Sequence, residues 1–527
     1  MDLNQEITRR RTFAIISHPD AGKTTLTEKL LLYSGMIRTA GMVGSRKGQK
    51  AASSDWMSME QERGISITAS AMQFEYKDCK INILDTPGHQ DFSEDTYRTL
   101  TAADSVIMVI DCAKGVETQT RKLFEACRLR GIPVLTFVNK MDSYGKGPIE
   151  LMEEVESVLG IPAAALNWPI GCGKEFKGLA DRAKNEINLY TKAKSGGAAK
   201  PHVDYMDVAT AQGNDKISDE EIASVREDLE LLEMAGNEFT REAYLNCKVT
   251  PVFFGSAIYN YGVEPLFDAL VELAPSPAPR PADKNDGEEI EIAPDEDFSA
   301  YVFKLQANMN PKHRDCIAFL RVNSGVYEKD MSVLHHRTKK KVRLAAPQVL
   351  MAASRETLES AYPGDVIGIV NTAGLAIGDT VSHKGGFEFK KLPYFQPELF
   401  ARVVPKDLGK RKAIDKGLAQ LSAEGTIQLM YEYNDTFSYP FLAAVGRLQF
   451  EVLQHRLRDE YKVDTRLDML PYTCSAWIKG DASKFKVPFN SKLVQDCFDR
   501  PMILFSNPWE KDYARKENPD HELLDYA

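Results

Sequence analysis

The fold of this chain is decided by a stretch near its N-terminus, Phe13-Ala14-Ile15-Ile16-Ser17-His18-Pro19-Asp20-Ala21-Gly22-Lys23-Thr24. The first four residues form a short apolar run that is typical of a buried parallel strand, and helix-like sequence follows Thr24. Between them, the residues from Ser17 to Thr24 match a phosphate-binding loop, except that Ser17 replaces its first glycine. Such a loop turns backbone N–H groups onto phosphate oxygens at the start of a helix, so the stretch predicts a nucleotide-binding α/β domain.

Four more short apolar runs follow and alternate with polar, helix-like segments. They lie at residues 81–84, 106–110, 134–138 and 252–254. This alternation indicates βαβ units that build a doubly wound, largely parallel sheet. The Gly-rich stretch at residues 195–201 predicts a loop inside an insertion before the last of these strands.

Two motifs predict how a triphosphate is held and hydrolysed. Lys23 is expected to reach the β- and γ-phosphates, and the Thr24 hydroxyl is expected to bind Mg²⁺. Asp85 ends its strand, where an Asp that supports the Mg²⁺ shell has to lie. Gly88 can offer its N–H to the γ-phosphate because it has no side chain, and His89 then lies beside the attacking water. Taken alone, a chance Gly-Lys-Thr turn or a surface loop histidine would also fit these residues.

A third motif predicts that the base is guanine. Asn139-Lys140-Met141-Asp142 ends the strand at residues 134–138. The Asp142 carboxylate can accept from both N1–H and the N2 amine of guanine, whereas adenine offers neither donor and would leave the carboxylate unpaired. Lys140 can lay its stem over the base, and a backbone N–H of Gly255-Ser256-Ala257 can meet guanine O6.

A polar segment at residues 60–68 lies between the first two motifs. A hydroxyl of this segment is expected to complete the Mg²⁺ shell while the γ-phosphate is present, and loss of that phosphate would release the segment. A polar surface turn is the simpler alternative.

The sequence changes character twice along its 527 residues, and this length suggests about three domains. A proline-rich linker at residues 274–281 ends the first part. Strand-like runs and turns between residues 298 and 381 are typical of a small β-barrel. Strands then mix with helical apolar spacing at residues 412–422 and 448–461. We therefore expect three domains: a GTP-binding P-loop domain at 1–280, a β-barrel domain at 281–390 and an α+β domain at 391–527.

Composition narrows the class of protein. The formal net charge of −10 argues against a general nucleic-acid coat protein. Two local basic stretches, at residues 335–343 and 406–412, could dock on RNA, or could be a solvated hairpin and a solvated turn. The N-terminus lacks the pattern of a signal peptide, no apolar run reaches about 18 residues, and the 8 cysteines are scattered. We expect a cytoplasmic protein with reduced thiols and no membrane span.

Four motifs together resemble those of the ribosome-dependent translational GTPases. They are Asp20-Ala21-Gly22-Lys23-Thr24, Arg63-Gly64-Ile65-Ser66, Asp85-Thr86-Pro87-Gly88-His89 and Asn139-Lys140-Met141-Asp142. The usual form of the second motif ends in Thr, so the resemblance assigns Mg²⁺ binding to Ser66, with Thr68 as the second candidate. Within this family the chain is most similar to the GTPase release factors, on residues 55–57, 311–315 and 446–451. Its length also favours that group over the longer elongation factors.

The resemblance implies a nucleotide site that is made by the residues of these motifs. Expected to bind GTP or GDP are Ser17, His18, Pro19, Asp20, Ala21, Gly22, Lys23, Thr24, Thr25, Asp85, Thr86, Pro87, Gly88, His89, Asn139, Lys140, Met141, Asp142, Gly255, Ser256 and Ala257. The expected catalytic residues are His89, Lys23 and Asp20. The expected Mg²⁺ ligands are Thr24, Ser66 and Asp85.

The resemblance also implies an activity and partners. The chain is expected to hydrolyse GTP on the ribosome, to contact large-subunit RNA and ribosomal proteins, and to speed departure of class I release factors after peptide release. It is expected to act as a monomer. Alternatives are an elongation or ribosomal-protection GTPase, a non-hydrolysing ribosome-binding scaffold, and a metabolic P-loop kinase or ATPase. Asp142 argues against the kinase, and the intact Lys23, Thr24, Asp85 and His89 argue against the scaffold.

Overall fold

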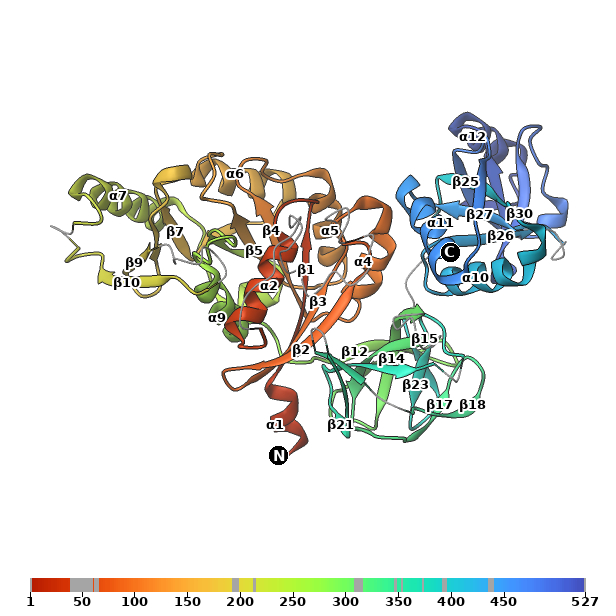
Figure 1. Cartoon of the computed structure of the whole chain (residues 1–527), viewed down its shortest axis with the longest axis horizontal. Helices are drawn as coiled ribbons and strands as arrows, with labels where there is room; N and C mark the ends of the chain where they lie inside the picture. The colour runs from red at the N-terminus through yellow and green to blue at the C-terminus, as the bar shows by residue number, and fades with distance from the viewer. Residues whose placement is uncertain are drawn as a thin grey trace.

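The computed structural model describes most of the chain, in three bodies that follow one another from the N-terminus to the C-terminus (Figure 1). The described residues are 2–37, 60, 66–191, 199–211, 215–307, 316–345, 348–351, 354–371, 374–390, 396–434 and 440–525. Three of the segments that carried the family resemblance, at residues 55–57, 63–65 and 311–315, lie outside the described residues, as does most of the loop at 195–201.

The first body is built on a seven-stranded sheet with the order β2-β3-β1-β4-β5-β11-β6. Its strands are β1 (Arg10–Ser17), β2 (Ser70–Tyr76), β3 (Cys79–Asp85), β4 (Ser105–Asp111), β5 (Val134–Asn139), β6 (Ala163–Ala165) and β11 (Thr250–Phe254). All neighbouring pairs are parallel except β2 with β3. The predicted doubly wound sheet and its five predicted strands are thus confirmed.

Helices cover both faces of this sheet, which is why its strands are apolar without alternation. One face carries α4 (Ser93–Leu100), α5 (Thr118–Leu129) and α6 (Pro148–Leu159), and the other carries α2 (Lys23–Tyr33) and α9 (Val263–Leu273). Strand β1 shows the principle: Ala14 and Ile16 pack into the first core, whereas Phe13 and Ile15 pack into the second. The short helix α1 (Leu3–Thr8) precedes β1, and the 3-10 turn η1 (Gln90–Phe92) precedes α4.

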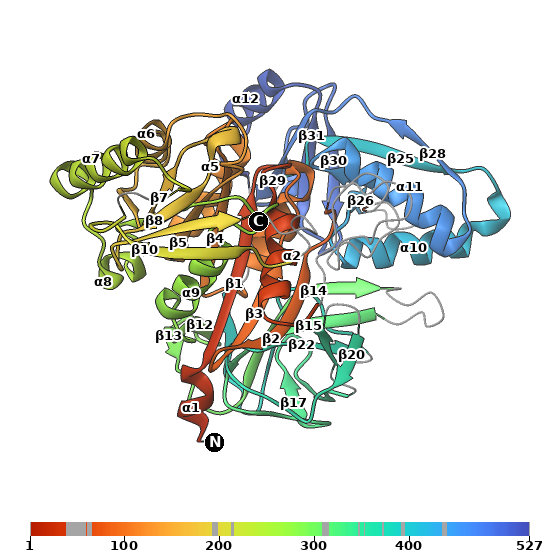
Figure 2. The same ribbon diagram turned by 60° about the vertical axis from the view of Figure 1, so that its left-hand side comes forward.

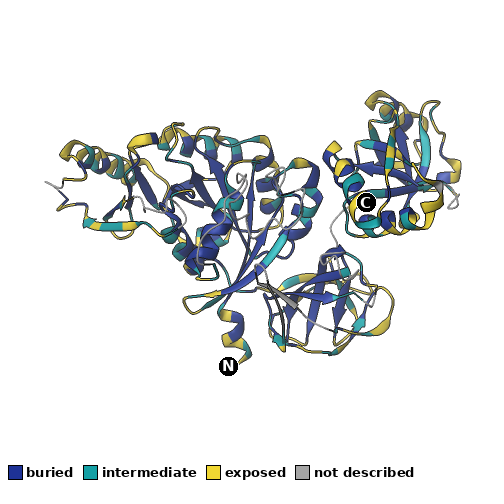
Figure 3. Ribbon diagram, viewed as in Figure 1, coloured by how far each residue is buried: buried dark blue, intermediate teal, exposed yellow. Residues whose placement is uncertain are grey.

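The predicted insertion contains a second, antiparallel sheet that the sequence analysis did not anticipate. Its order is β10-β9-β8-β7, with β7 (Asn167–Ile170), β8 (Gly178–Asp181), β9 (Glu186–Thr191) and β10 (His202–Asp207). The 3-10 turn η2 (Gly173–Glu175) lies between β7 and β8, and α7 (Asp219–Ala235) and α8 (Arg241–Leu245) follow β10. Only Ile222 and Val225 of α7 are buried, so most of this helix faces solvent (Figure 3).

The second body is a β-structure. Its eight-stranded sheet contains β14 (Ser299–Ala307), β15 (Cys316–Ser324), β17 (Ser332–His335), β18 (Lys340–Arg343), β19 (Gln348–Met351), β20 (Ser354–Thr357), β22 (Val366–Val370) and β23 (Thr380–Ser382). Smaller sheets join β16 (Tyr327–Glu328) to β21 (Ser360–Ala361), and β12 (Arg280–Lys284) to β13 (Glu289–Ile292) and β24 (Phe387–Phe389). The predicted barrel fold is confirmed, but the end of the predicted linker already belongs to β12. The first basic stretch forms the β17–β18 hairpin, in which His335 and His336 are buried.

The third body confirms the predicted α+β class. Its sheet contains β25 (Leu399–Pro405), β26 (Gln428–Glu432), β27 (Phe441–Ala444), β28 (Thr465–Met469), β29 (Cys474–Lys479), β30 (Lys492–Asp496), β31 (Pro501–Phe505) and β32 (Glu522–Leu524). Its helices are α10 (Arg411–Ala423), α11 (Arg447–Tyr461) and α12 (Pro508–Glu517), with 3-10 turns η4 (Leu408–Lys410) and η5 (Ala482–Lys484). The two segments with predicted helical spacing, 412–422 and 448–461, form most of α10 and α11.

Buried polar contacts join the bodies, and the second and third bodies both lie on the side of the first that is away from β9, β10 and α7 (Figures 1 and 2). Arg321 of β15 donates to Ala102 O at 2.6 Å and contacts Asp104 Oδ2 at 2.6 Å. In the third body, the Leu448 N–H of α11 donates to Asp91 Oδ2 at 2.8 Å. The third body therefore contacts the segment that directly follows His89.

Candidate functional site

The loop between β1 and α2 has the strained shape that a phosphate cradle requires. Asp20 and Gly22 have φ angles of 67° and 100°, in the left-handed region. A Cβ on Gly22 would lie 2.2 Å from Asn139 Nδ2, so a side chain is excluded there. Asn139 Nδ2 donates to Ala21 O at 2.8 Å, and Lys140 Nζ donates to Asp20 O at 2.6 Å. The guanine motif therefore holds the phosphate loop in place.

A cleft of about 340 Å³ lies over this loop. It brings together residues from four of the predicted segments: the phosphate loop, the segment at 60–68, the strand end after Asp85 and the guanine motif. Its lining consists of Ser17, His18, Pro19, Asp20, Gly22, Lys23, Thr24, Thr25, Ser66, Gly88, His89 and Lys140. A cleft of this size, with convergent polar groups at the carboxyl ends of parallel strands, is typical of a ligand site in an open α/β sheet.

The oxygen atoms at one end of the cleft fit a hard divalent cation. Thr24 Oγ1 and Ser66 Oγ lie 3.2 Å apart, a separation that neighbouring ligands of one Mg²⁺ ion can have. The Asp85 carboxylate, at the end of β3, lies next to the phosphate loop: its Oδ1 accepts from Lys23 Nζ at 2.6 Å, and both side chains are buried. Thr68 is a weaker candidate, since its hydroxyl donates to Glu60 at 3.2 Å. The described residues contain no cluster of three His, Cys, Asp or Glu side chains that could hold a metal ion.

His89 enters the cleft from the N-terminal side of η1 and is half-buried. In the neutral ring its Nδ1 accepts from the Asp91 N–H at 3.2 Å, and in the protonated ring the same nitrogen, 3.3 Å from Asp91 Oδ1, donates to that carboxylate. The hydrogen bond with Asp91 raises the pKa of His89, and this effect outweighs the opposing effect of burial. Because Nδ1 is engaged, Nε2 is the ring nitrogen that can face a water molecule. Gly88 packs against Pro19, where an added Cβ would lie 3.6 Å from the Pro19 backbone.

Of the base-reading residues, Lys140 lines the cleft, whereas Asp142, Ser256 and Ala257 lie outside its lining. Ser256 Oγ donates to Asp142 Oδ1 at 2.5 Å and orients that carboxylate. Lys140, whose φ angle is 68°, forms an ion pair with Asp111 at 2.8 Å. The Ala257 N–H, one of the three backbone N–H groups predicted as candidates to meet guanine O6, donates to Asn139 Oδ1 at 2.9 Å. A base oxygen at this position would share that N–H with the Asn139 side chain.

Some predicted residues support the site from below without lining it. Ala21, Met141 and Thr86 are buried, and the Thr86 hydroxyl donates to Ile15 O at 2.7 Å. Pro87 O accepts from Thr96 at 3.1 Å. These side chains fix the course of the backbone, and only their main-chain atoms are available to a ligand.

Four carboxylates around the site were missed by the sequence analysis. Asp111 pairs with Lys140, Asp91 contacts His89, and Glu117 lies 3.2 Å from His18 Nε2. Glu60 is fully buried and accepts from the Ile67 and Thr68 N–H groups at 2.9 and 3.0 Å. A signal was present only for Asp111, which ends the strand predicted at residues 106–110.

Three family models match the chain, one on each body. The "Elongation factor Tu GTP binding domain" matches residues 8–276, "Elongation factor G domain 2" matches 297–384, and "Class II release factor RF3, C-terminal domain" matches 389–515. The fold, the cleft and these matches define a GTPase of the translation-factor class. Among the described residues, no helix is long and apolar enough to cross a membrane.

Curated relatives identify the particular group. The chain is 49% identical to peptide chain release factor 3 of Nostoc punctiforme, over 99% of this chain and 96% of the relative. It is 48% identical to peptide chain release factor 3 of Trichormus variabilis, with the same coverage. The chain belongs to the peptide chain release factor 3 family and is a GTPase associated with translation termination. A crystal structure of a Thermus thermophilus protein shares the fold, with a TM-score of 0.70, 22% identity, and coverage of 92% of this chain and 71% of that chain.

Proposed function

We propose that this chain is a ribosome-dependent GTPase that promotes dissociation of class I release factors from the ribosome after peptide release. One observation carries the proposal: a single cleft contains the phosphate loop, Ser66, Gly88 and His89, and the segment after His89 contacts the third body. Near-full-length similarity to relatives named peptide chain release factor 3 supports the termination role.

Binding of GTP places opposite charges close together. The N–H groups of the phosphate loop and the N-terminus of α2 face the β- and γ-phosphates, and the Lys23 ammonium group adds a point charge there. Asp20, in its left-handed conformation, shapes the loop beside the bridging oxygens. Asp142, oriented by Ser256, accepts from N1–H and the N2 amine of guanine.

Hydrolysis requires a water molecule that is held in line with the β–γ bridge. The water oxygen bonds to the γ-phosphorus, the bond to the bridging oxygen breaks, and GDP and inorganic phosphate leave. His89 Nε2 faces this water, while Nδ1 remains against Asp91. Mg²⁺, held by Thr24, Ser66 and the nearby Asp85, would neutralise charge on the phosphates.

The other two bodies couple GTP hydrolysis in the cleft to the ribosomal partners. Residues 1–280 hydrolyse GTP, while residues 281–390 and 391–527 dock on large-subunit RNA and ribosomal proteins and transmit the change. The protein acts in the cytoplasm as a monomer. The link between Asp91 and Leu448 supports such transmission, because it ties α11 to the residues beside the γ-phosphate.

The test measures departure of a labelled class I release factor from post-termination ribosomes. We expect the parent protein with GTP to accelerate departure. We expect Asp142→Asn to be inactive with GTP and active with xanthosine triphosphate. Reactions without nucleotide and with GDP are the controls. If the release factor leaves at the same rate with and without this protein, the termination role is excluded, while ribosome-stimulated phosphate release would still report the GTPase.

A further inference from the structure

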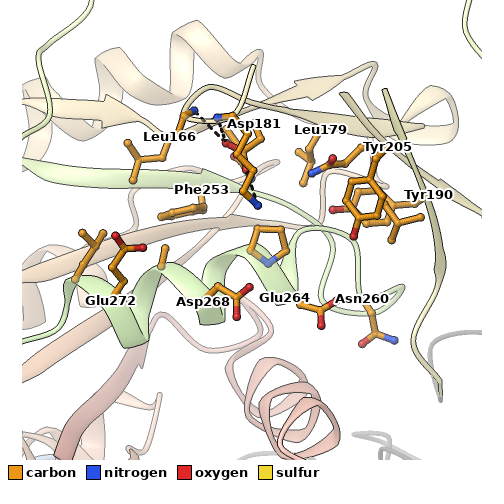
Figure 4. Close-up of a pocket in the computed structure, with 18 of the residues that line it drawn as sticks. Leu166, Leu179, Asp181, Tyr190, Tyr205, Phe253, Asn260, Glu264, Asp268 and Glu272 are labelled. Atoms are coloured by element: carbon orange, nitrogen blue, oxygen red, sulfur yellow. Dashed lines mark hydrogen bonds and ion pairs between the residues drawn. The ribbon is translucent and has the colours of Figure 1, made fainter. Parts of the chain in front are cut away.

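A second cavity lies in the first body, away from the nucleotide cleft. It is a groove of about 470 Å³ between the insertion sheet and α9 (Figure 4). Its apolar base includes Phe253, Leu179 and Leu273, which are all buried. The volume is in the usual range for a site that takes a small organic molecule.

One wall of the groove carries a regular row of negative charge. Glu264, Asp268 and Glu272 are spaced four residues apart on α9 and follow one another along the helix in Figure 4. At a rise of about 1.5 Å per residue, neighbouring carboxylates are about 6 Å apart and the row extends about 12 Å. Across the groove, a fourth carboxylate, Asp181, pairs at 3.7 Å with Lys184, which is the one ammonium group among the lining residues.

The facing wall is aromatic. Tyr190 and Tyr205 of this wall come from β9 and β10, and Tyr33, at the end of α2, also lines the groove. Burial and the neighbouring Glu264 carboxylate raise the pKa of the Tyr33 phenol, in keeping with a negative potential here. Aromatic faces and carboxylates together favour cations that have an aliphatic stem.

The chain's own lysines already show how an alkylammonium group fits this row. Lys77 Nζ lies 2.7 Å from Asp268, and Lys200 Nζ lies 3.6 Å from Glu264 and 4.3 Å from the centre of the Tyr33 ring. Both pairs are substantially exposed, so each contributes little to stability and can be replaced by an incoming ammonium group. Glu272 has no ion-pair partner within 4 Å in the part of the chain that the structure describes.

A buried polar atom also points to a ligand. Asn188, on β9, lines the groove and is 4% exposed. Its side-chain oxygen has no hydrogen-bond partner among the described residues, and an unsatisfied buried acceptor costs stability. An N–H donor that enters the groove would remove this cost.

We propose that this groove binds a linear aliphatic polyamine. Amines separated by a four-carbon chain are about 6 Å apart, which matches the i, i+4, i+8 spacing of carboxylates on α9. The methylene segments would lie on the tyrosine faces and the apolar base, and the ammonium groups would pair with the row of carboxylates. The same row repels phosphate groups and therefore favours a polyamine over RNA as the occupant of the groove.

The test is isothermal titration calorimetry of the full chain with spermidine at constant ionic strength. We expect saturable binding of one spermidine per chain. Glu264→Gln combined with Glu272→Gln should weaken it at least tenfold, and Tyr205→Ala should also weaken it. The matched control is Glu227→Gln with Glu230→Gln on exposed α7, which removes the same charge outside the groove and should change affinity less than twofold.

Three outcomes would overturn the proposal. The first is that no saturable binding occurs below millimolar spermidine. The second is that the groove variants and the control variants weaken spermidine binding equally. The third is that Mg²⁺ displaces bound spermidine as well as unlabelled spermidine does at the same ionic strength. GTP binding by the groove variants is measured in parallel and should equal that of the parent. The inference is therefore independent of the proposed role in termination.

Discussion

Replacing Asp142 by Asn tests the guanine assignment most directly. The carboxylate is half-buried at the end of β5, and one of its oxygens accepts from Ser256 Oγ at 2.5 Å. Asn has nearly the same shape, so the strand end and the Ser256 contact should survive. The change replaces one acceptor by an NH₂ donor and removes the negative charge.

The expected loss follows from the contacts that disappear. A hydrogen bond to a charged group contributes about 1.5–3 kcal/mol, and guanine offers two donors, N1–H and the N2 amine. The substituted side chain would keep one acceptor oxygen, which Ser256 already shares, while its amide nitrogen would face a guanine donor. We therefore expect a net loss of about 3–4 kcal/mol, or two to three orders of magnitude in GTP affinity at about 1.4 kcal/mol per tenfold.

The assay is equilibrium binding of a fluorescent GTP analogue, with GTP and xanthosine triphosphate as competitors. Xanthine carries a carbonyl where guanine has its amine, so the Asn amide can donate to it and the nucleotide preference should invert. Asp283→Asn, on exposed β12, is the control for loss of one charge. If Asp142→Asn binds GTP as tightly as the parent, Asp142 does not read guanine.

Three further predictions concern the switch and the third body. His89→Ala should bind GTP normally but slow ribosome-stimulated single-turnover hydrolysis about 10²–10⁴-fold, and a parental rate would remove His89 from the mechanism. Asp91→Asn should lower the pKa of His89 in an NMR titration, because the hydrogen bond that raises it is weakened. In the parent, this pair stabilises the fold fully below the usual pKa of His, and the stabilisation is lost as pH rises through the raised pKa of His89. The variant should therefore be less stable than the parent at the acidic end of this pH range. An unchanged titration of His89 in the variant would contradict the contact. Arg456→Ala should lower the free energy of unfolding in urea by about 3–5 kcal/mol, because the buried Glu424 carboxylate, 2.5 Å from Arg456, loses this ion-pair partner. The control is Arg458→Ala at an exposed position of the same helix, which should lower it little. Equal losses in the two variants would refute this interpretation.

The elements that the sequence predicted well are those whose local residue pattern fits only one type of secondary structure. Strands buried on both faces are continuous apolar runs, so β1, β3, β4 and β5 were found from residues such as Phe13 to Ile16 alone. The insertion sheet was missed because its strands are short and partly exposed, as the intermediate and exposed positions of β10 show. The β12–β13 hairpin was not predicted: the predicted linker includes Arg280 and Pro281 of β12, acidic residues dominate the rest of the hairpin, and only Ala282 and Ile292 are buried.

Prediction of the site was likewise limited to residues whose position follows from the local sequence pattern. Motif spacing placed Lys23, Thr24, Gly88 and His89 in one cleft, because the carboxyl ends of neighbouring parallel strands must meet. It could not show that Glu60 holds the Ile67 and Thr68 amides, since that contact depends on the path of a loop. The resemblance favours Ser66 over Thr68 as Mg²⁺ ligand, the hydrogen bond from the Thr68 hydroxyl to Glu60 supports that preference, and it stays a proposal.

The contact between Asp91 and α11 supports the proposal that a change at the γ-phosphate is transmitted to the third body. The Asp91 carboxylate accepts from the Leu448 N–H at 2.8 Å. Burial acts to raise the pKa of Asp91, but the hydrogen bonds from His89 and this amide outweigh it and hold that pKa below its usual range. A Cβ on Gly446 would lie 2.0 Å from Asp91 Cγ, so the Gly446 backbone and the Asp91 side chain touch with no space between them. Phe92 and Leu448 share one buried apolar cluster beside this bond. A shift of residues 88–92 toward a phosphate must therefore carry α11 with it or break a charge-assisted bond that contributes about 1.5–3 kcal/mol, which is comparable to the coupling energy of typical allosteric sites.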